Sequence, residues 1–328
     1  MPHGRKRLVA ALAAIAALIG LGLIPATPTY ADPSIDSVQK KVDKLLHEAE
    51  LAAENANDIQ IQLTGMREDL ATLQADEQRQ QRDFDAIQAQ VQDAVVRQYQ
   101  GEGLSTLGQV VVSDDPSGFL AQLSTMSAVT DVQTDLYTDY ATALKALDIQ
   151  HEATVKRLAQ IAAAEKQAAA AKATADDKLA TAQAELDKLK EEERQALLAG
   201  SGTTVIPSNV PVSGRAAAAV HFALSQVGKA YVYGAAGPNA YDCSGLTMVA
   251  WAHAGVGLPH SSSAQFGSGP HVPASQLRPG DLVFYYSPIS HVAIYIGNGL
   301  IVHAAHPGAG VRVAGLYSMP YAGAVRPG

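Results

Sequence analysis

The sequence has very little cysteine: Cys243 is the only one among its 328 residues. A single thiol can form no disulfide within the chain, so even an oxidising compartment gives it no cross-linking role. Basic residues are also in the minority, with 24 Lys and Arg against 32 Asp and Glu. Nucleic-acid binding needs a clustered basic face, so this composition argues against that class of function. We interpret the acidic excess as a solvated surface.

Long apolar runs are absent except near the N-terminus. Three basic residues precede an apolar run at 8–24, and a small-residue site ending at Ala31 follows it. This layout is typical of a secretory signal peptide, so we predict that 1–31 is cleaved and that the protein is secreted, into the cell wall or a periplasm-like space outside the cytoplasmic membrane. The alternative is an uncleaved anchor, because the run is close to the lower limit of about 17 residues for a membrane span.

Two long helical blocks follow, and we predict that 32–199 is an all-α antiparallel coiled-coil hairpin. In the first block apolar residues alternate spacings of four and three, which indicates a coiled coil. This seam consists of Val38, Val42, Leu45, Ala49, Ala52, Ala56, Ile59, Leu63, Met66, Leu70 and Leu73. The second block has a stripe made of Leu136, Tyr140, Ala143, Leu147, Thr154, Leu158, Ile161, Leu179, Ala182, Leu186 and Leu189. Its alanine-rich middle, 162–175, is helical by propensity but offers little packing area, so we expect it to be the loosest part.

The turn between the blocks, 101–118, is the tip of the predicted hairpin. Its glycines and an Asp-Asp-Pro run are typical of one helix ending and another beginning. Apolar residues around the tip exceed what a two-helix seam can bury, so they form a small subdomain or dock on a partner. The alternative is that the whole region is only a spacer.

A Gly-, Ser-, Thr- and Pro-rich segment at 200–213 is predicted to be a linker. The composition changes after it, and 214–328 is predicted to be a compact α+β domain in which an antiparallel sheet packs against helices. The expected helices are 215–227 and 243–254, and the expected strands are 282–286, 291–296, 300–304 and 311–314.

Cys243 lies at the predicted start of a helix, directly after Asp242. An Asp in this position can accept hydrogen bonds from the first backbone N–H groups of the helix. The positive end of the helix dipole favours a thiolate, so we expect the pKa of Cys243 to be lowered and the residue to be a nucleophile. The alternative is that Cys243 is a buried, inert side chain.

A cysteine nucleophile needs a base and a group that orients the base, and His291 and His303 lie on two strands of a predicted hairpin. A two-residue turn at Asn298 and Gly299 pairs Ile294 with His303 and leaves His306 across from His291. A three-residue turn that includes Gly297 pairs Ala293 with His303, which places His291 and His303 on one face, about 7 to 8 Å apart at the backbone. We expect His303 to orient His291, and His306 is the alternative.

The same three residue types can also hold zinc with one open position. However, the sequence contains no CxxC, HxxxH or HExxH spacing, and the Asp-Cys-Ser-Gly setting favours a nucleophile, so no metal site is predicted.

Residues 215–327 resemble the NlpC/p60 family of papain-like peptidoglycan endopeptidases. The motifs that carry the resemblance are Tyr231-Val232-Tyr233-Gly234, Asp242-Cys243-Ser244-Gly245-Leu246, Leu258-Pro259-His260-Ser261-Ser262 with Gln265, Leu277-Arg278-Pro279-Gly280-Asp281-Leu282, His291-Val292-Ala293-Ile294-Tyr295-Ile296-Gly297 and His303-Ala304. Two positions depart from the family pattern: Ala235 replaces a second glycine, and His260 stands where Arg is common.

The resemblance implies a papain-like fold, no cofactor, and a cysteine peptidase that cleaves the amide between D-isoglutamate and meso-diaminopimelate in peptidoglycan stem peptides. It implies that Cys243 is the nucleophile, His291 the base and His303 the orienting residue. The positions that match the substrate groove are Tyr231, Asp242, Ser244 and Ser262.

The predicted coiled coil is similar to that of division-associated cell-wall hydrolases, which implies a membrane-bound division complex as a partner. The unburied tip and the weak alanine-rich segment suggest that the hairpin blocks the groove until a partner pulls it away. The alternative function is a regulatory or scaffolding protein whose hydrolase domain is weak or inactive.

Overall fold

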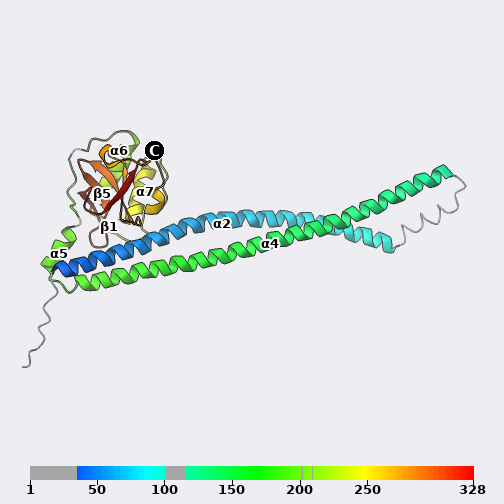
Figure 1. Cartoon of the computed structure of the whole chain (residues 1–328), viewed down its shortest axis with the longest axis horizontal. Helices are drawn as coiled ribbons and strands as arrows, with labels where there is room; N and C mark the ends of the chain where they lie inside the picture. Colours follow the sequence, from blue (N-terminus) through cyan, green and yellow to red (C-terminus); the bar gives the residue numbers. More distant parts are fainter. Residues whose placement is uncertain (1–34, 101–115, 201, 209) are drawn as a thin grey trace, which may run out of the picture.

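The structure, a computed structural model, describes residues 35–100, 116–200, 202–208 and 210–328. A long helical hairpin carries a small α+β unit beside one end (Figure 1). The predicted signal peptide and tip residues 101–115 lie outside the described residues. Within the described part, no helix is both long and apolar enough to cross a membrane.

Two long helices, α2 (Ile35–Tyr99) and α4 (Pro116–Leu186), form the hairpin, and a short helix, α5 (Glu191–Ala199), follows them. The start of α2 packs on the end of α4, since Val38 and Val42 cluster with Ala182 and Leu186. Further along, Leu63 packs against Ile161. The two helices are therefore antiparallel, and the predicted hairpin is confirmed.

The alanine-rich segment of α4 contributes to the helix seam. Ala164, Ala168, Ala171 and Ala175 recur at spacings of four and three, and all are buried. This segment therefore faces the partner helix although its side chains are small, and the expectation that it is the loosest part of the hairpin stays a prediction. Leu158, assigned to the stripe from the sequence, is instead 46% exposed.

The C-terminal unit combines helices with a five-stranded antiparallel sheet in the order β6-β5-β4-β3-β7, as the predicted fold class requires. The sheet consists of β3 (Leu282–Tyr285), β4 (His291–Gly297), β5 (Leu300–Ala304), β6 (Val311–Gly315) and β7 (Tyr321–Val325). The helices are α6 (Gly214–Ser225), α7 (Cys243–His253), α8 (Ser262–Gln265) and the 3₁₀ helix η1 (Ala274–Gln276). A parallel pair, β1 (Ala230–Tyr231) and β2 (Ala240–Tyr241), precedes α7. The sequence did not indicate β7, β1 or β2.

Helices α6 and α7 cover one face of the sheet. The main core joins Val220 and Ala223 of α6, Leu246 and Ala250 of α7, and inward-facing residues of β3 to β6 such as Ile294. Because α7 packs directly against β4, its first residue lies beside the first residue of that strand. This packing positions Cys243 and His291.

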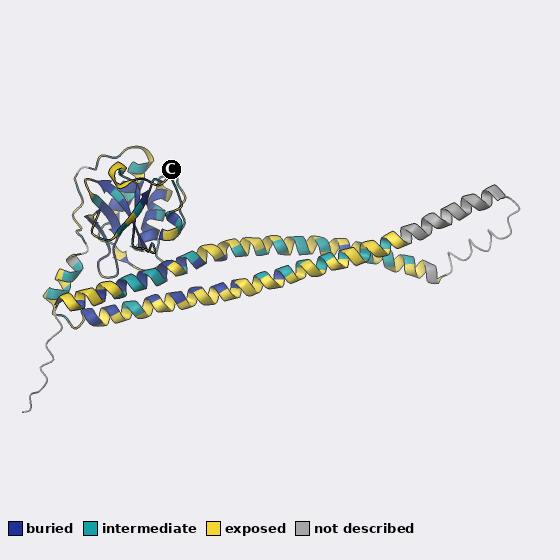
Figure 2. Cartoon of the chain, viewed as in Figure 1, coloured by how far each residue is buried: buried dark blue, intermediate teal, exposed yellow. Residues whose placement is uncertain are grey.

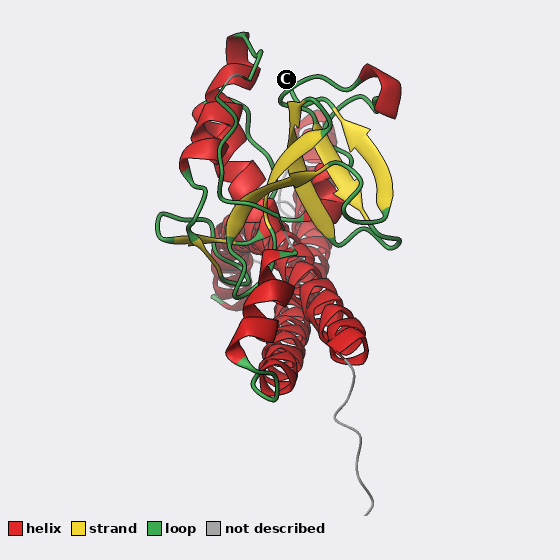
Figure 3. Cartoon of the chain, turned by 90° about the vertical axis from the view of Figure 1, so that its left-hand side faces the viewer, coloured by secondary structure: helices red, strands yellow, loops and turns green. Residues whose placement is uncertain are grey.

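The α+β unit lies against the first part of α2 (Figures 1 and 3). Buried residues of α2 are concentrated in this stretch, whereas its later part is mostly exposed or half-buried (Figure 2). The end of α5 and the segment after it also contact the unit: the Arg312 guanidinium donates to the carbonyl of Leu198 at 2.9 Å, and Thr203 pairs with Val313 of β6. The unit therefore contacts both α2 and the connection that leads into it.

We expect Leu63→Ala to destabilise the hairpin by about 2 to 5 kcal/mol, because it removes a buried side chain from the seam and leaves a cavity. Leu63 is 1% exposed, whereas Ile61, two residues before it, is 38% exposed and provides the control Ile61→Ala. Denaturant unfolding followed by helical circular dichroism measures both. Equal effects of the two substitutions would contradict the assigned seam.

Candidate active site

Cys243 opens α7 directly after the residue that caps it. The Asp242 carboxylate accepts from the backbone N–H of Gly245 at 2.6 Å, so the predicted N-cap is confirmed. Its second oxygen accepts from the N–H of Gly234 at 2.8 Å. Asp242 thereby joins the start of α7 to the loop after β1 and fixes the position of the thiol.

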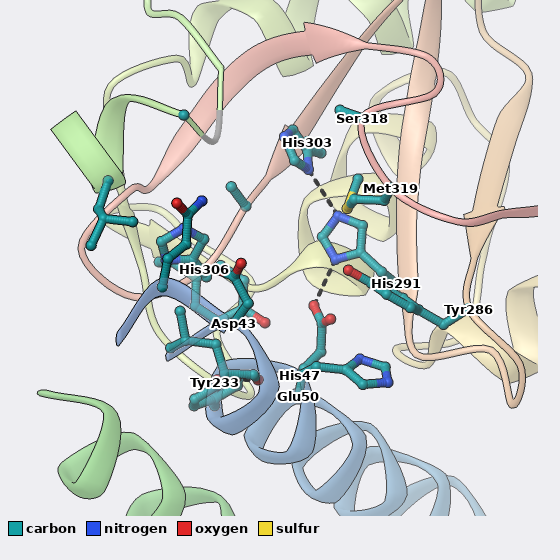
Figure 4. A pocket seen from close by; sticks show the side chains of 16 residues that line it. Asp43, His47, Glu50, Tyr233, Tyr286, His291, His303, His306, Ser318 and Met319 are labelled. Carbon is teal, nitrogen blue, oxygen red and sulfur yellow. Dashed lines mark hydrogen bonds and ion pairs between the residues drawn. The ribbon is translucent and has the colours of Figure 1, made fainter. Parts of the chain in front are cut away.

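The β4–β5 hairpin brings His291 and His303 together. Ile294 pairs with Val302, and the same register continued by one residue places Ala293 opposite His303. This is the pairing expected for the three-residue turn. The register shifts next to Gly297. His291 Nε2 lies 2.8 Å from His303 Nδ1. His306 instead bonds through Nδ1 to the carbonyl of Pro307 at 2.8 Å. Of the two histidines considered from the sequence, the structure pairs His303 with His291 (Figure 4).

The thiol completes the arrangement, since Cys243 Sγ lies within 4.8 Å of a ring nitrogen of His291. Nucleophile, base and orienting residue thus come from α7, β4 and β5. Because Nε2 of His291 is bonded to His303, Nδ1 is the nitrogen left to exchange a proton with the thiol or a leaving group.

One side of α2 covers this site. We call His47, Glu50, Glu54, Asn57 and Asp58 the acidic edge of α2. Their spacing of three or four residues places them on one side of the helix. Glu50, Glu54 and Asn57 are buried. This edge was not identified from the sequence, because the acidic residues were interpreted as solvated surface.

Glu50 contacts the base itself. Its Oε1 lies 2.6 Å from His291 Nδ1 (Figure 4). An ionised carboxylate can only accept, so this contact keeps a proton on Nδ1. A ring protonated there cannot accept the proton of the Cys243 thiol. The contact therefore leaves His291 unable to act as a base toward Cys243.

Glu54, one turn further along α2, reaches past the thiol. Its Oε1 accepts from the Ser244 hydroxyl at 2.7 Å and lies 3.8 Å from Cys243 Sγ. Its Oε2 accepts from the backbone N–H of Ser262. Ser244 and Ser262 are two of the residues predicted to line the substrate groove, and Glu54 forms hydrogen bonds with both.

Three further contacts extend the covered area. Asn57 donates to the Asp242 carboxylate at 3.3 Å, and Asp58 accepts from the Ser263 hydroxyl at 2.9 Å. His47 packs against Tyr286 with 4.1 Å between ring centroids and an angle of 33° between the ring planes. Tyr231, the fourth predicted groove residue, is buried beneath Tyr233, edge to face at 5.1 Å.

A cavity of about 290 Å³ remains on the histidine side of the site. Its lining includes Asp43, His303, His306 and Met319 (Figure 4). The empty space therefore lies beside the histidines, between α2 and the C-terminal unit, whereas side chains of α2 fill the space next to the nucleophile.

The environment of Cys243 raises the pKa of its thiol well above the ordinary value. Burial is the largest cause, followed by the charges of Glu54, Glu50 and Asp242. The sequence-based expectation of a lowered pKa is therefore wrong for this arrangement, because burial and the nearby carboxylates outweigh the helix dipole. With α2 in place, Cys243 is a neutral thiol that is 1% exposed.

We expect Glu54→Arg to accelerate alkylation of Cys243 by iodoacetamide at least tenfold, because an arginine cannot fit between Ser244 and Ser262 and must displace α2. Asn55→Arg is the matched control, since Asn55 is exposed on the next position of the same helix. Mass spectrometry of the single thiol gives the rate. If the wild-type chain reacts as fast as Glu54→Arg, α2 does not protect the thiol in solution.

Comparison with known proteins relates the C-terminal unit to the same family that its motifs resemble. The chain is 51% identical over 96 residues to a protein of Mycobacterium tuberculosis named "Probable endopeptidase", a match that covers 29% of this chain and 25% of that protein. A "Probable endopeptidase" of Corynebacterium glutamicum is 40% identical over 116 residues, which cover 35% of this chain and 56% of that protein. The chain thus spans between a quarter and just over half of the length of these two relatives.

Among solved structures, the peptidoglycan hydrolase RipB of Mycobacterium tuberculosis is 30% identical, with a TM-score of 0.32 over 34% of this chain and 64% of that one. The model of the NlpC/P60 family matches residues 228–325, which include Cys243, His291 and His303. This part of the chain is therefore an NlpC/P60 domain.

Proposed function

We propose that the protein is a secreted peptidoglycan endopeptidase that cleaves the D-isoglutamyl to meso-diaminopimelate amide of stem peptides. The observation that carries the proposal is the adjacency of Cys243, His291 and His303 inside the NlpC/P60 match, with the hydrogen bond between the two histidines at 2.8 Å. These residues have the types and the mutual arrangement that a thiol peptidase needs. The substrate class comes from the motif resemblance and from relatives named as endopeptidases.

The reaction requires a thiolate and a protonated base. Once the groove is open, Cys243 gives its proton to His291, and the thiolate attacks the scissile carbonyl carbon. Backbone N–H groups near the start of α7 stabilise the oxyanion. The amide C–N bond then breaks while His291 protonates the leaving amine. Water, deprotonated by His291, releases the acyl group from sulfur, and His303 holds the ring in place throughout.

We further propose that α2 inhibits the enzyme. Glu50 blocks the base, and Glu54 occupies donors beside the nucleophile. Substrate and the acidic edge of α2 need the same groups, so they exclude each other. Cleavage therefore requires α2 and the NlpC/P60 domain to separate.

We propose that a membrane-bound partner causes this separation. The far part of the hairpin extends well beyond the NlpC/P60 domain (Figure 1), which gives a partner access to the helices without contact with the site. A membrane-bound division complex that binds this part could pull α2 away, consistent with a role in wall remodelling during division. The tip residues 101–115 that were assigned this role from the sequence lie outside the described structure.

We expect the full chain carrying Glu54→Arg to cleave purified stem-peptide fragments at least tenfold faster than the wild-type chain, with loss of cleavage when Cys243→Ala is added. The first change opens the groove, and the second removes the nucleophile. Mass spectrometry of the products identifies the bond. Activity that survives Cys243→Ala would exclude thiol catalysis, and an inactive Glu54→Arg chain that alkylates rapidly would favour a scaffolding role.

Inhibition should weaken as the pH rises. Burial, and then the charge of Asp242, raises the pKa of Glu54 from 4.5 to about 7. A separated α2 exposes Glu54 and restores its ordinary pKa, so the docked state holds more protons between these two values. Docking is therefore strongest below about pH 4.5 and weakens up to about pH 7, by about 3 kcal/mol in all.

Glu54→Gln tests this dependence, because an amide keeps a hydrogen-bond acceptor but does not ionise. The ratio of wild-type to Glu54→Gln cleavage rates is expected to rise between about pH 4.5 and 7 and then to level off. The ratio cancels the titration of the catalytic groups, which both chains share. A ratio that stays flat over this range would show that Glu54 carries no proton in the docked state.

A further inference from the structure

Three elements place metal-binding atoms together at the covered thiol. A carboxylate oxygen of Glu50 from α2, the sulfur of Cys243 from α7 and a ring nitrogen of His291 from β4 all lie within 4.8 Å of one another. All three residues are buried, with exposures of 7%, 1% and 1%. Two of the donors belong to the catalytic pair, and the third belongs to the helix that covers it.

These donors suit a thiophilic divalent cation. Zinc binds thiolate sulfur at about 2.3 Å and imidazole nitrogen or carboxylate oxygen at about 2.0 to 2.2 Å, so two donors of a tetrahedral site lie about 3.2 to 3.8 Å apart. The Glu50 oxygen and His291 Nδ1 are now 2.6 Å apart, and no donor pair exceeds 4.8 Å. To reach this spacing, the Glu50 oxygen and His291 Nδ1 must separate by about 0.6 Å, and the widest donor pair must approach by at most about 1.0 Å.

The charge around the thiol also favours a cation. The Glu54 carboxylate lies 3.8 Å from Cys243 Sγ, and Asp242 is buried next to it. In the described part of the chain, the ion pairs of Glu50 and Asp242 are with His291 and His260, and no Lys or Arg pairs with either carboxylate. Buried carboxylates that no fixed cation balances are costly, and a bound dication offsets that cost.

We propose that Glu50, Cys243 and His291 form a binding site for one zinc ion that links α2 to the catalytic pair. This inference rests on the proposed function in one respect only, which is that α2 covers Cys243 and His291 in the inhibited protein. Binding replaces the S–H bond of Cys243 with a sulfur–metal bond and releases the proton to solvent. His291 coordinates through Nδ1, so the metal displaces the proton that Glu50 holds there. By exchange with solvent the ring takes up a proton on Nε2, which donates to Nδ1 of a His303 ring protonated on its own Nε2. A solvent molecule takes the fourth position.

The consequence is an inhibited state that metal stabilises. Zinc occupies both the nucleophile and the base, and it binds with all three donors only when α2 is in place. By mass action, a ligand that prefers the covered state shifts the equilibrium toward it. Removal of zinc would then be a step toward activation, separate from any partner that acts on the hairpin.

Cobalt substitution in the full-length chain tests the site, because a cobalt–thiolate bond gives a charge-transfer absorption that other donors do not. We expect the wild-type chain to bind one Co²⁺ with this band, Cys243→Ser to lack it, and Glu50→Gln to bind at least tenfold more weakly. Zn²⁺ should displace the Co²⁺. Asp58→Asn is the matched control on the acidic edge of α2 and should bind like the wild-type chain, since Asp58 contacts Ser261 and Ser263 instead.

The Glu50→Gln result needs one check, which is that α2 remains docked. A glutamine oxygen can still accept from His291 Nδ1, so slow alkylation of Cys243 by iodoacetamide should persist in this variant without metal. Absence of the charge-transfer band in the wild-type chain overturns the proposal. So does equal affinity in wild type and docked Glu50→Gln, because the metal would then be held by the catalytic pair alone. Neither measurement uses peptidoglycan, so failure here leaves the endopeptidase proposal standing.

Discussion

The contact between Glu50 and His291 Nδ1 determines the chemical state of the whole site. It occupies the one ring nitrogen that His303 leaves available, and it does so with a group that accepts a proton rather than donating one. A thiol beside such a ring has no base. The rest of the interface follows the same pattern, since Glu54 and Asn57 each form a hydrogen bond with a polar group at the start of α7 or α8.

Such an interface is held by polar contacts that are individually strong but require buried charge. Hydrogen bonds to a carboxylate are roughly twice as strong as neutral ones, yet moving the carboxylate out of water costs several kcal/mol. Glu54 illustrates the balance: it accepts from Ser244 and Ser262, while burial and Asp242 raise its pKa to about 7. The net free energy of docking is therefore a small difference between large terms, and a proton, a cation or a pull on the hairpin can change its sign.

The fold of the NlpC/P60 domain was largely predictable because the features that identify its helices and strands lie within short stretches of sequence. Asp242 caps the helix that Cys243 begins, and four predicted strands appear within one residue of their expected ends. The pairing of His303 with His291 was left open because it depends on the register next to Gly297, where the hairpin is irregular. Strand β7 was missed because its Tyr-Ala-Gly-Ala-Val run has few of the features that identify a strand.

That the hairpin blocks the groove was a hypothesis from the sequence, but the residues of α2 that contact the site could not be predicted, for a different reason. Glu50 and His291 are 241 positions apart, and an acidic residue on an amphipathic helix has the same pattern whether it faces water or a groove. The available signal was a second stripe, beside the apolar seam, in which His47, Glu50, Glu54 and Asn57 repeat at spacings of three and four. Helix α2 has an apolar face that packs on α4 and an acidic face that packs on the site, so the residue types on both faces are constrained by contacts. The first partner, α4, holds α2 in the hairpin through apolar packing, so a movement of the hairpin as a unit separates the acidic face from the groove without breaking the seam.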